Sequence, residues 1–574
     1  LAVGEFDPLV IPETPCLPAA LRLSAYPGEE AGYYLVQFQG PIATSQVDAL
    51  VATGAEVFDY IPDFTFIVKM DGNTRAGIER MAQVRWVGIY QPAYRISRNV
   101  LALVQDDGPV SGFPQPDDDR QVADLRDLWS DDPVEIIVTI FRGEALKPIV
   151  ARIEAMGGDV LDRSQSKWKS RLKVSIDSSH FTDLASISGV RWIEEAPEWK
   201  LSNNESADIM GVREVWDTHG LYGDGQTVAV CDTGLDQGSA SPGSLQDDFE
   251  DGSGDSRVVA IHDLVGDGAS DVNSGHGTHV AGSVLGNGDL SGAVPSVHSY
   301  PDTAYAGMAP EANLVFQAAE DNGSGSLSGI PSDLNTLFAQ AESSGAEVHT
   351  NSWAGSAYGM YNSSSEDVDE YVWDHKDFTV LFAAGNGGID CDADGVIDLY
   401  SMKTPATAKN CIAVGASEND RPSGSSPTPG YDIAWGSGSW AVEYPTYPIS
   451  TDHVSDDPAG MAAFSSRGPA LDGRYKPDVV APGTNVASVR SSVASNTGWG
   501  PVNDNYMFNG GTSMATPLAA GAAALVRQYY TDEEGVTPSA ALIKATMANG
   551  ATNIAPGQYG TGAKQESPSR RPTN

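Results

Sequence analysis

Asp232 and His276 are the first residues along the chain whose type and setting suit catalysis. Asp232 follows the apolar run Thr227–Cys231, and a Thr-Gly pair comes next, although an Asp-Thr-Gly triplet can also be only a turn. His276 opens the segment His-Gly-Thr-His-Val-Ala-Gly, whose small residues indicate a helix packed closely on a neighbour. A histidine at the exposed start of such a helix is placed to act as a base.

His279 stands three residues after His276, and two histidines at that spacing on a helix could bind a metal ion. No Glu sits beside them, as one does in the helix motif of zinc proteases. We therefore expect His279 to be a packed structural histidine. A metal-dependent hydrolase that uses both histidines is the alternative.

Ser513 and Asn386 are two further candidates. Ser513 follows Gly-Gly-Thr and opens an Ala-rich helix that ends near Tyr530. A serine at a helix N-terminus is usually only a cap, but the helix dipole and backbone amides there would also stabilise an oxyanion. Asn386 stands in Ala-Ala-Gly-Asn-Gly after a buried strand, where its amide could donate to an oxyanion; alone, Asn-Gly indicates a turn.

The elements that must position these residues alternate between strand and helix from about Asn203 onward. The runs Thr227–Cys231 and Thr379–Ala384 are continuously apolar, as buried parallel strands are. Residues 332–345 have the periodicity of an amphipathic helix. This alternation predicts an α/β fold with a parallel sheet and helices on both faces. Active sites on such sheets lie at the carboxyl ends of strands, which is where Asp232 and Asn386 stand.

The N-terminal third of the chain contains an internal repeat. Val84-Arg85-Trp86-Val87 returns as Val190-Arg191-Trp192-Ile193, about 105 residues later. Each copy begins with an apolar strand, 34–38 or 135–140, followed by a helical pattern, a strand, a short helix and the Val-Arg-Trp strand. The repeat predicts two small α+β modules in tandem, joined by a linker rich in Asp, Pro and Gly.

The composition is strongly acidic. The 574 residues include 34 Lys and Arg against 77 Asp and Glu, a formal net charge of -43. Such a chain repels nucleic acid and anionic membranes, so we expect neither as a partner. The chain contains no apolar run that could span a bilayer, and no signal peptide is visible. Four cysteines are too few for a disulfide scaffold.

Taken together and in this order, the four motifs resemble those of the subtilisin family of serine proteases, whose triad runs Asp, His, Ser along the chain. The resemblance covers about residues 203–549. Further similar stretches are Met308–Gln317, Phe464–Pro469 and Lys476–Gly483. Within the family the chain most resembles the KP-43-like alkaline proteases.

The resemblance implies that Ser513 is the nucleophile, His276 the general base and then acid, and Asp232 the residue that orients His276. Asn386 and the amide of Ser513 would form the oxyanion hole. The reaction would be hydrolysis of peptide bonds in polypeptide substrates through an acyl-enzyme. The family usually has Gly where Ala354 stands. The substrate would lie along two edges, formed by Gly323, Ser324 and Gly325 and by Ser352, Trp353 and Ala354.

The two N-terminal modules resemble the inhibitor-type prosegments of this family, which assist folding and cover the active site until they are cut. We expect the second module to be the intramolecular inhibitor and self-cleavage at Ser202–Asn203 to release it. The alternative is that the modules stay attached as accessory domains. The expected organisation is an N-terminal extension (1–30), module 1 (31–98), a linker (99–131), module 2 (132–202) and a C-terminally truncated catalytic domain (203–574).

A candidate cation site follows Asn386. The segment Asp390–Ser401 has acidic residues at positions 1, 3, 5 and 9 of a twelve-residue calcium loop and Gly at position 6, but Ser instead of Glu at position 12. The alternative is an acidic turn. Cys391 and Cys411 flank this insertion and are candidates for a disulfide. The calcium ligands we expect are Asp390, Asp392, Asp394, Val396 and Asp398.

Tandem prosegments, high acidity and a calcium loop together favour export. We therefore expect a secreted, monomeric, self-processed proenzyme of a serine endopeptidase. One rival is a pseudoenzyme, a subtilisin fold kept as a binding module, against which the intact set of four residues argues. A pro-protein convertase specificity is the rival within the protease class.

Overall fold

A computed structural model of the chain describes residues 9, 21–26, 30–61, 63–97, 100, 133–165, 169–195, 207–421, 433–554, 557 and 570–571. The chain divides into two compact units, residues 1–196 and 197–574. Ser202 and Asn203 at the expected cleavage site lie outside the described residues, as do most of the expected N-terminal extension and linker.

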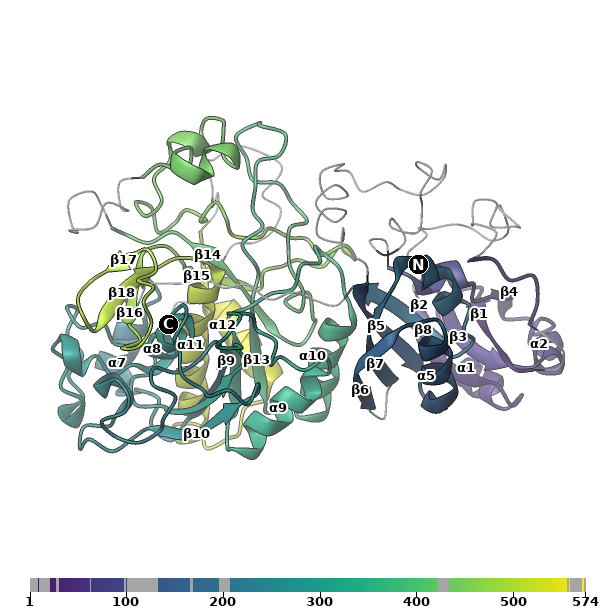
Figure 1. Cartoon of the computed structure of the whole chain (residues 1–574), viewed down its shortest axis with the longest axis horizontal. Helices are drawn as coiled ribbons and strands as arrows, with labels where there is room; N and C mark the ends of the chain where they lie inside the picture. Colours follow the sequence, from purple (N-terminus) through teal and green to yellow (C-terminus); the bar gives the residue numbers. More distant parts are fainter. Residues whose placement is uncertain are drawn as a thin grey trace. The chain divides into compact units, whose positions relative to one another are not determined.

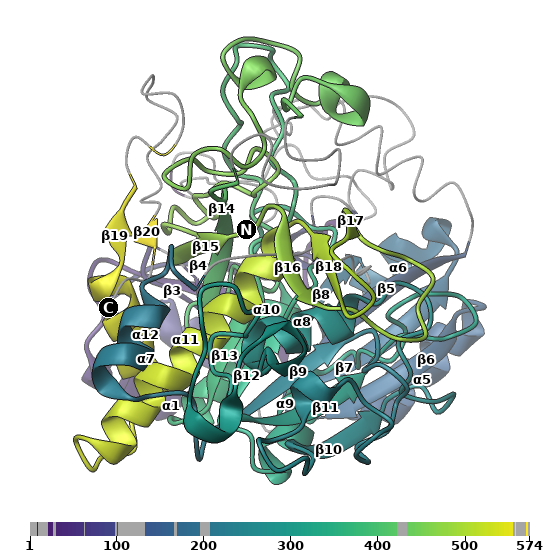
Figure 2. The same ribbon diagram turned by 90° about the vertical axis from the view of Figure 1, so that its left-hand side faces the viewer.

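The described residues of the second unit form a seven-stranded parallel sheet with the strand order β10-β11-β9-β12-β13-β14-β15 (Figures 1 and 2). Its inner strands are almost entirely buried, because both faces of the sheet are covered, and this explains their continuous apolar runs. The strands are β9 (Thr227–Asp232), β10 (Val258–Asp263), β11 (Asn313–Ala318), β12 (Val348–Asn351), β13 (Thr379–Ala383), β14 (Ile412–Ser417) and β15 (Val479–Pro482).

Helices pack on both faces of this sheet, as the sequence predicts. Val228 and Val230 of β9 share a core with α8 and α11, whereas Ala229 and Cys231 of the same strand share another with α9 and α10. Neighbouring residues of a strand point to opposite faces, so β9 contributes to both cores. Helices α8 and α11 lie side by side (Figures 1 and 2). The helices are α7 (Val212–His219), α8 (His276–Leu285), α9 (Leu334–Ser343), α10 (Ser363–Asp374), α11 (Thr512–Asp532) and α12 (Ala540–Gly550).

Shorter elements complete the described part of this unit. An antiparallel sheet of three short strands precedes α11, and a short pair of strands follows α12. Among the described residues, no helix combines the length and the apolar character needed to cross a membrane. These strands are β16 (Val486–Val489), β17 (Gly500–Pro501), β18 (Tyr506–Asn509), β19 (Thr552–Asn553) and β20 (Arg570–Arg571).

The described residues of the first unit form two four-stranded antiparallel sheets of matching order, β2-β3-β1-β4 and β6-β7-β5-β8. The two α+β modules expected from the repeat are therefore confirmed. The elements are β1 (Gly32–Phe38), α1 (Thr44–Val51), β2 (Glu56–Ile61), β3 (Thr65–Met70), α2 (Gly72–Ile78) and β4 (Val84–Ile89), then β5 (Val134–Phe141), α5 (Leu146–Ala155), β6 (Asp159–Gln165), β7 (Lys169–Ile176), α6 (Phe181–Ala185) and β8 (Val190–Glu195).

Each module has one strand more than the sequence pattern predicts. Between its two helices lies a hairpin, β2–β3 or β6–β7, where we expected a single strand. The extra strands β2 and β6 are largely exposed and lack the regular alternation of apolar and polar residues that marks a strand in a sequence. The first hairpin turns at Asp63 and Phe64, which both adopt positive φ angles.

The two modules share one hydrophobic core, which contains residues of β1 and β3 together with residues of β5, β7 and β8. The ring of Tyr33 stacks on that of Phe141 with 3.8 Å between their centroids. Arg95, fully buried, joins the modules: its guanidinium donates to the carbonyl oxygens of Ile187 (2.9 Å) and Tyr90 (3.0 Å). The two modules therefore make up one folded body.

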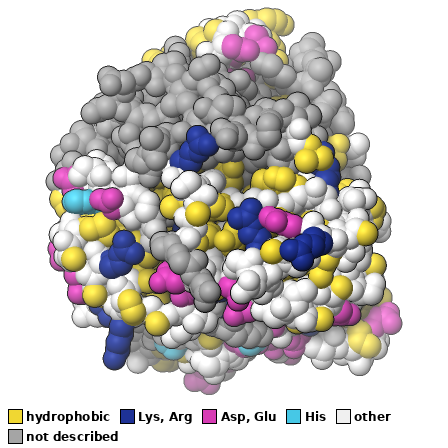
Figure 3. All heavy atoms as spheres, turned by 90° about the vertical axis from the view of Figure 1, so that its right-hand side faces the viewer, with side chains coloured by type: hydrophobic (Ala, Val, Ile, Leu, Met, Phe, Trp, Pro, Cys, Tyr) yellow, Lys and Arg dark blue, Asp and Glu magenta, His cyan; other side chains and the backbone are white. Residues whose placement is uncertain are grey.

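Figure 3 shows one face of the molecule, where the described Lys and Arg side chains lie among Asp and Glu side chains and small hydrophobic patches. Charges of both signs are thus interspersed on this face despite the large negative net charge.

Replacing Arg95 tests whether the modules depend on one another. In a Ser513→Ala chain, we expect Arg95→Met to destabilise both modules together by about 3 kcal/mol, because it leaves several buried carbonyl groups without a donor. Hydrogen–deuterium exchange of β1 and β5 would measure this. The control is Arg163→Met, because Arg163 is exposed in an ion pair with Glu154 and should cost less than about 0.5 kcal/mol. Loss of protection in one module alone would contradict the shared core.

Candidate active site

A short hydrogen bond joins Asp232, the last residue of β9, to His276, the first residue of α8. Nδ1 of His276 lies 2.6 Å from Oδ1 of Asp232, and the two side chains are 3% and 0% exposed. The other ring nitrogen, Nε2, is buried and has no hydrogen-bond partner among the described residues. With Nδ1 held by a carboxylate, Nε2 presents a lone pair that can accept a proton.

Asp271 holds the start of α8 in place. Its carboxylate accepts hydrogen bonds from the amide and hydroxyl of Thr278 (2.9 and 2.7 Å) and from the hydroxyl of Thr233 (3.0 Å). Burial raises the pKa of Asp271 to about 6. A side chain at Gly277 would collide with the carbonyl oxygen of Gly234, which confirms the close packing expected of this helix. Our sequence analysis missed Asp271, although it stands just before the His276 segment.

Ser513 lies at the N-terminus of α11 and is 2% exposed. Gly511, two residues before Ser513, has a φ of 140°, a conformation that favours glycine. The hydroxyl of Ser352, just past β12, donates to the carbonyl of Ser513 (2.6 Å). Because β12 is the neighbour of β9, this contact brings Ser513 to the carboxyl edge of the sheet, where Asp232 lies.

The side chain of Asn386 forms hydrogen bonds with Thr512, the residue before Ser513. Its Oδ1 accepts hydrogen bonds from both the amide and the hydroxyl of Thr512, each 2.9 Å long. The amide of Gly385 donates in turn to the Thr512 hydroxyl (3.2 Å). These contacts fix the orientation of the Asn386 side chain, so that its NH2 group faces away from Thr512.

The two expected substrate edges differ in character. The turn at Gly323, Ser324 and Gly325 is exposed and is shaped by Asp321, whose carboxylate accepts the amides of Gly323 (2.9 Å) and Ser324 (2.8 Å). On the other edge the indole of Trp353 is fully buried and donates to the carbonyl of Cys231 (3.0 Å). Only the backbone of Trp353 can therefore meet a substrate.

His279 is a packed structural histidine, as expected. It is fully buried, Nε2 lies 3.2 Å from the carbonyl oxygen of Met507, and burial lowers its pKa to about 3. Among the described residues, neither His276 nor His279 belongs to a group of side chains that could hold a metal ion. This arrangement does not favour the metal-dependent alternative.

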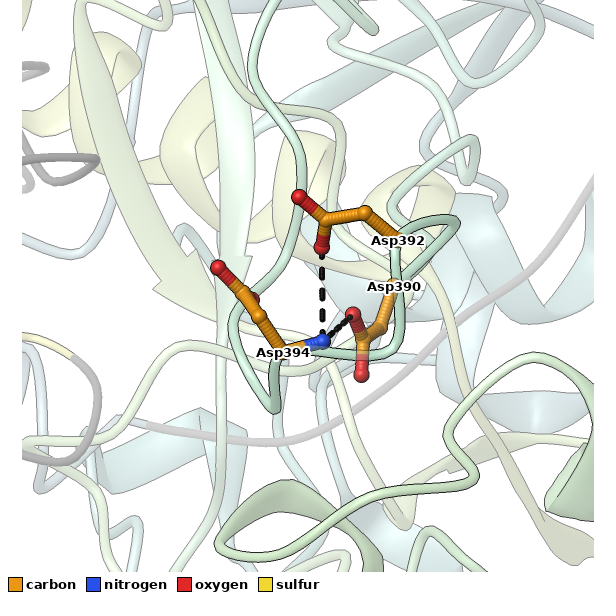
Figure 4. A group of neighbouring side chains, drawn as sticks. All are labelled: Asp390, Asp392 and Asp394. Carbon is orange, nitrogen blue, oxygen red and sulfur yellow. Dashed lines mark hydrogen bonds between the residues drawn. The ribbon is translucent and has the colours of Figure 1, made fainter.

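Three of the expected calcium ligands come together. One carboxylate oxygen from each of Asp390, Asp392 and Asp394 lies within 4.8 Å of the other two (Figure 4). Burial, with a smaller effect of the two neighbouring charges, raises the pKa of Asp390. Hard oxygen ligands at this spacing fit Ca²⁺. Oδ2 of Asp398 accepts a hydrogen bond from the amide of Cys391 (2.8 Å). The amide of Val396 donates a hydrogen bond to the carboxylate of Asp394 (2.9 Å).

The disulfide expected between Cys391 and Cys411 is wrong, because both residues are thiols. Cys391 follows the carboxyl end of β13, whereas Cys411 immediately precedes the amino end of β14, the parallel neighbour of β13. The two cysteines therefore belong to opposite edges of the sheet. Cys411 is fully buried there, with its sulfur 3.6 Å from the carbonyl oxygen of Ala408.

Glu320 is a buried acid near the candidate site that our sequence analysis also missed. It is 4% exposed, and its amide donates to the carbonyl of Thr233 (3.2 Å). Oε2 is buried with no hydrogen-bond partner in the described part of the chain. Burial, together with the nearby charges of Asp271 and Asp232, raises the pKa of Glu320 to about 7. No motif marks this position in the sequence.

The chain is similar to known proteases over most of its length. A model of the subtilase family matches residues 223–562, and a model of a domain of unknown function matches residues 1–91. The chain is 25% identical over 570 residues to the serine protease/ABC transporter B family protein tagD of Dictyostelium discoideum, covering 87% of this chain and 30% of tagD. It is 29% identical over 432 residues to serine protease AprX of Bacillus subtilis (strain 168), covering 71% and 82%.

Among solved structures, the crystal structure of fervidolysin from Fervidobacterium pennivorans is similar at a TM-score of 0.46 and 19% identity, covering 76% of this chain and 59% of fervidolysin. The chain spans about a third of the length of the Dictyostelium relatives that it matches.

Glu320 should make stability depend on pH. The pKa of Glu320 is raised in the folded state. Its contribution to the free energy of unfolding is therefore complete below its ordinary pKa and is lost as the pH rises through about 7. In a Ser513→Ala chain, Glu320→Gln should therefore gain about 1 to 2 kcal/mol of unfolding free energy over the parent between about pH 5 and pH 8. Guanidinium unfolding would measure this, with the exposed Glu533→Gln as control. Parallel pH curves for Glu320→Gln and its parent would contradict the assignment.

Proposed function

This chain belongs to the subtilase family, and on that premise we propose that it is a serine endopeptidase that hydrolyses peptide bonds in polypeptides through an acyl-enzyme. The observation that carries the proposal is the buried Asp232–His276 pair, whose Nε2 lacks a hydrogen-bond partner among the described residues. Export, a monomeric state and the particular likeness to the KP-43-like alkaline proteases stay predictions.

In the proposed reaction, the hydroxyl oxygen of Ser513 attacks the carbonyl carbon of the scissile bond while Nε2 of His276 takes the hydroxyl proton. Asp232 keeps the second ring proton on Nδ1 and stabilises the imidazolium that forms. His276 then gives its proton to the leaving amine, and the acyl group stays on Ser513. A water molecule, deprotonated by His276, then attacks the acyl carbon. The bond to the Ser513 oxygen breaks, the acyl group leaves as a carboxylic acid, and His276 returns its proton to Ser513.

Asn386 and the backbone amide of Ser513 are proposed to stabilise the oxyanion of both steps. Supporting this, Thr512 holds the oxygen of the Asn386 amide, so that the NH2 group of the side chain is directed elsewhere. The amide of Ser513 belongs to the first turn of α11, whose first amides have no partner within the helix. The substrate is proposed to lie along the edges at 323–325 and 352–354.

The N-terminal modules are proposed to be a prosegment that acts as an intramolecular inhibitor and is cut between Ser202 and Asn203. The boundary between the two compact units, at residues 196 and 197, lies close to that bond and supports the proposal. Since the modules share one core, we propose that they leave together. The module and linker boundaries given above stay predictions.

Calcium is proposed to bind at Asp390, Asp392 and Asp394, with Val396 and Asp398 as further candidates. The ion would offset most of the charge of three carboxylates, each of which has an oxygen within 4.8 Å of an oxygen of the other two. Its role would be structural, because the ion would hold the segment in one conformation. The segment follows Asn386 directly along the chain.

The activity test compares the wild-type chain with Ser513→Ala. We expect the wild type to hydrolyse casein, to be labelled by a fluorophosphonate on Ser513 and to be cut near residues 202 and 203. The variant should do none of these, because it lacks the nucleophile. Mass spectrometry would give both the labelled residue and the cleavage site. A wild type that stays unlabelled and inactive would show that the fold is used for binding only.

Calcium binding is tested by unfolding a Ser513→Ala chain with and without the ion. At a calcium concentration of about a hundred times its Kd, one site should add about 2.7 kcal/mol to the unfolding free energy. We expect Asp392→Asn combined with Asp394→Asn to lose this gain. The matched control is Asp532→Asn, an exposed aspartate at the end of α11. An equal gain in the double variant would place the calcium elsewhere.

A further inference from the structure

The residue on the acyl side of the scissile bond, which we call the acyl-side residue, is the one whose carbonyl carbon Ser513 attacks. In the proposed mechanism its carbonyl oxygen lies at Asn386, so its side chain must lie close to residues 384–387 and to the edge at 352–354. Side chains that reach this place decide which acyl-side residues the enzyme accepts. The inference below therefore rests on the proposed function.

Lys403 lies between these two segments. Its amide donates to the carbonyl of Ala384 (2.9 Å), two residues before Asn386. On its other side it pairs with Tyr358 in an antiparallel bridge, and the carbonyl of Thr404 accepts the amide of Gly355 (2.7 Å). The backbone at Lys403 thus connects the segment that carries Asn386 to the segment that continues from the substrate edge.

The side chain of Lys403 runs along the backbone on either side of Asn386. An ideal Cβ at Gly385 would lie 2.7 Å from its Cγ and 2.8 Å from its Cδ, and one at Gly387 would lie 3.5 Å from its Cε. Only glycine leaves room for the lysine stem at Gly385. The ammonium group ends 5.2 Å from the centroid of the Tyr358 ring, whose Cε1 would lie 2.8 Å from a Cβ at Gly387.

This placement puts a cation beside the point where the acyl-side residue is held. Lys403 is only half-buried, so part of its side chain is open to solvent. A tyrosine ring on one side and glycine backbone on the other partly shield that charge from water, which strengthens its interaction with a carboxylate. The same charge repels an incoming Lys or Arg.

We propose that Lys403 determines the specificity for the acyl-side residue and that the enzyme prefers Glu or Asp there over neutral or basic residues. The carboxylate of the substrate forms a charge-assisted hydrogen bond with the Lys403 ammonium. Tyr358 holds the ammonium in position through its ring. This preference is opposite to that of a pro-protein convertase, which needs carboxylates to receive basic residues.

Internally quenched peptides that differ only in the acyl-side residue test the proposal on the full chain after its own processing. We expect kcat/KM for Glu to exceed that for Gln by about ten- to a hundredfold, the usual effect of a hydrogen bond to a charged group. Lys403→Met should bring this ratio close to one, and Lys403→Glu should shift the preference to Lys. A wild type that cleaves Gln, Leu or Lys as fast as Glu, or a Lys403→Met variant that keeps the ratio, would overturn the proposal.

Lys409→Met is the matched control. The Lys409 ammonium also lies over a tyrosine ring, 4.3 Å from the centroid of Tyr361, but Lys409 precedes β14 at the opposite edge of the sheet from Asn386. In Lys409→Met, the ratio of kcat/KM for the Glu peptide to that for the Gln peptide should equal the wild-type ratio. Because the ratio is measured within each variant, a smaller fraction of folded enzyme does not alter it.

Labelling of Ser513 distinguishes a failure of the proposed specificity from a failure of the proposed function. A wild type that is labelled by fluorophosphonate and cleaves peptides without an acidic preference overturns only the role of Lys403. A wild type that is neither labelled nor active overturns the proposed function and this specificity with it.

Discussion

The hydrogen bond between Asp232 and His276 is the constraint on which the second unit depends. It joins the end of a central strand to the start of a helix, and both side chains are buried. A buried carboxylate and imidazole are costly unless they are paired, so the surrounding packing must hold them at bonding distance. Asp271 and the close contact at Gly277 do this by fixing the first turn of α8 against the turn after β9.

Two further buried acids, Asp271 and Glu320, lie near the Asp232–His276 pair. Burial raises the pKa of both acids, and neither forms an ion pair among the described residues. Negative charge on this side of His276 contrasts with the cation Lys403, whose side chain runs beside Asn386. The candidate site is thus polarised, with acids behind the histidine and a cation where the acyl-side residue is proposed to lie.

The first unit shows how a tandem repeat becomes one body. The matching strand orders of its two sheets follow from the repeated sequence. The shared core does not, because Tyr33 stacks on Phe141 and Arg95 reaches Ile187 only once the chain has brought the two modules together. The two modules are therefore expected to fold and unfold as one body.

The sequence by itself determined the parallel sheet with helices on both faces, the two α+β modules and the order of the motifs around Asp232, His276, Asn386 and Ser513. These features are local, since periodicity and short motifs record them within a few residues. The exposed strands β2 and β6 escaped prediction because they lack such periodicity.

Only the tertiary structure decided which distant residues meet. It separated Cys391 from Cys411 by placing them at opposite edges of parallel strands, and it brought Glu320 and Lys403 to the candidate site from segments that carry no motif. The physical reason is that burial and proximity depend on the packing of strands and loops far apart in the chain. The pKa of an acid and the pairing of two cysteines depend on burial and proximity, so no local sequence pattern could predict either.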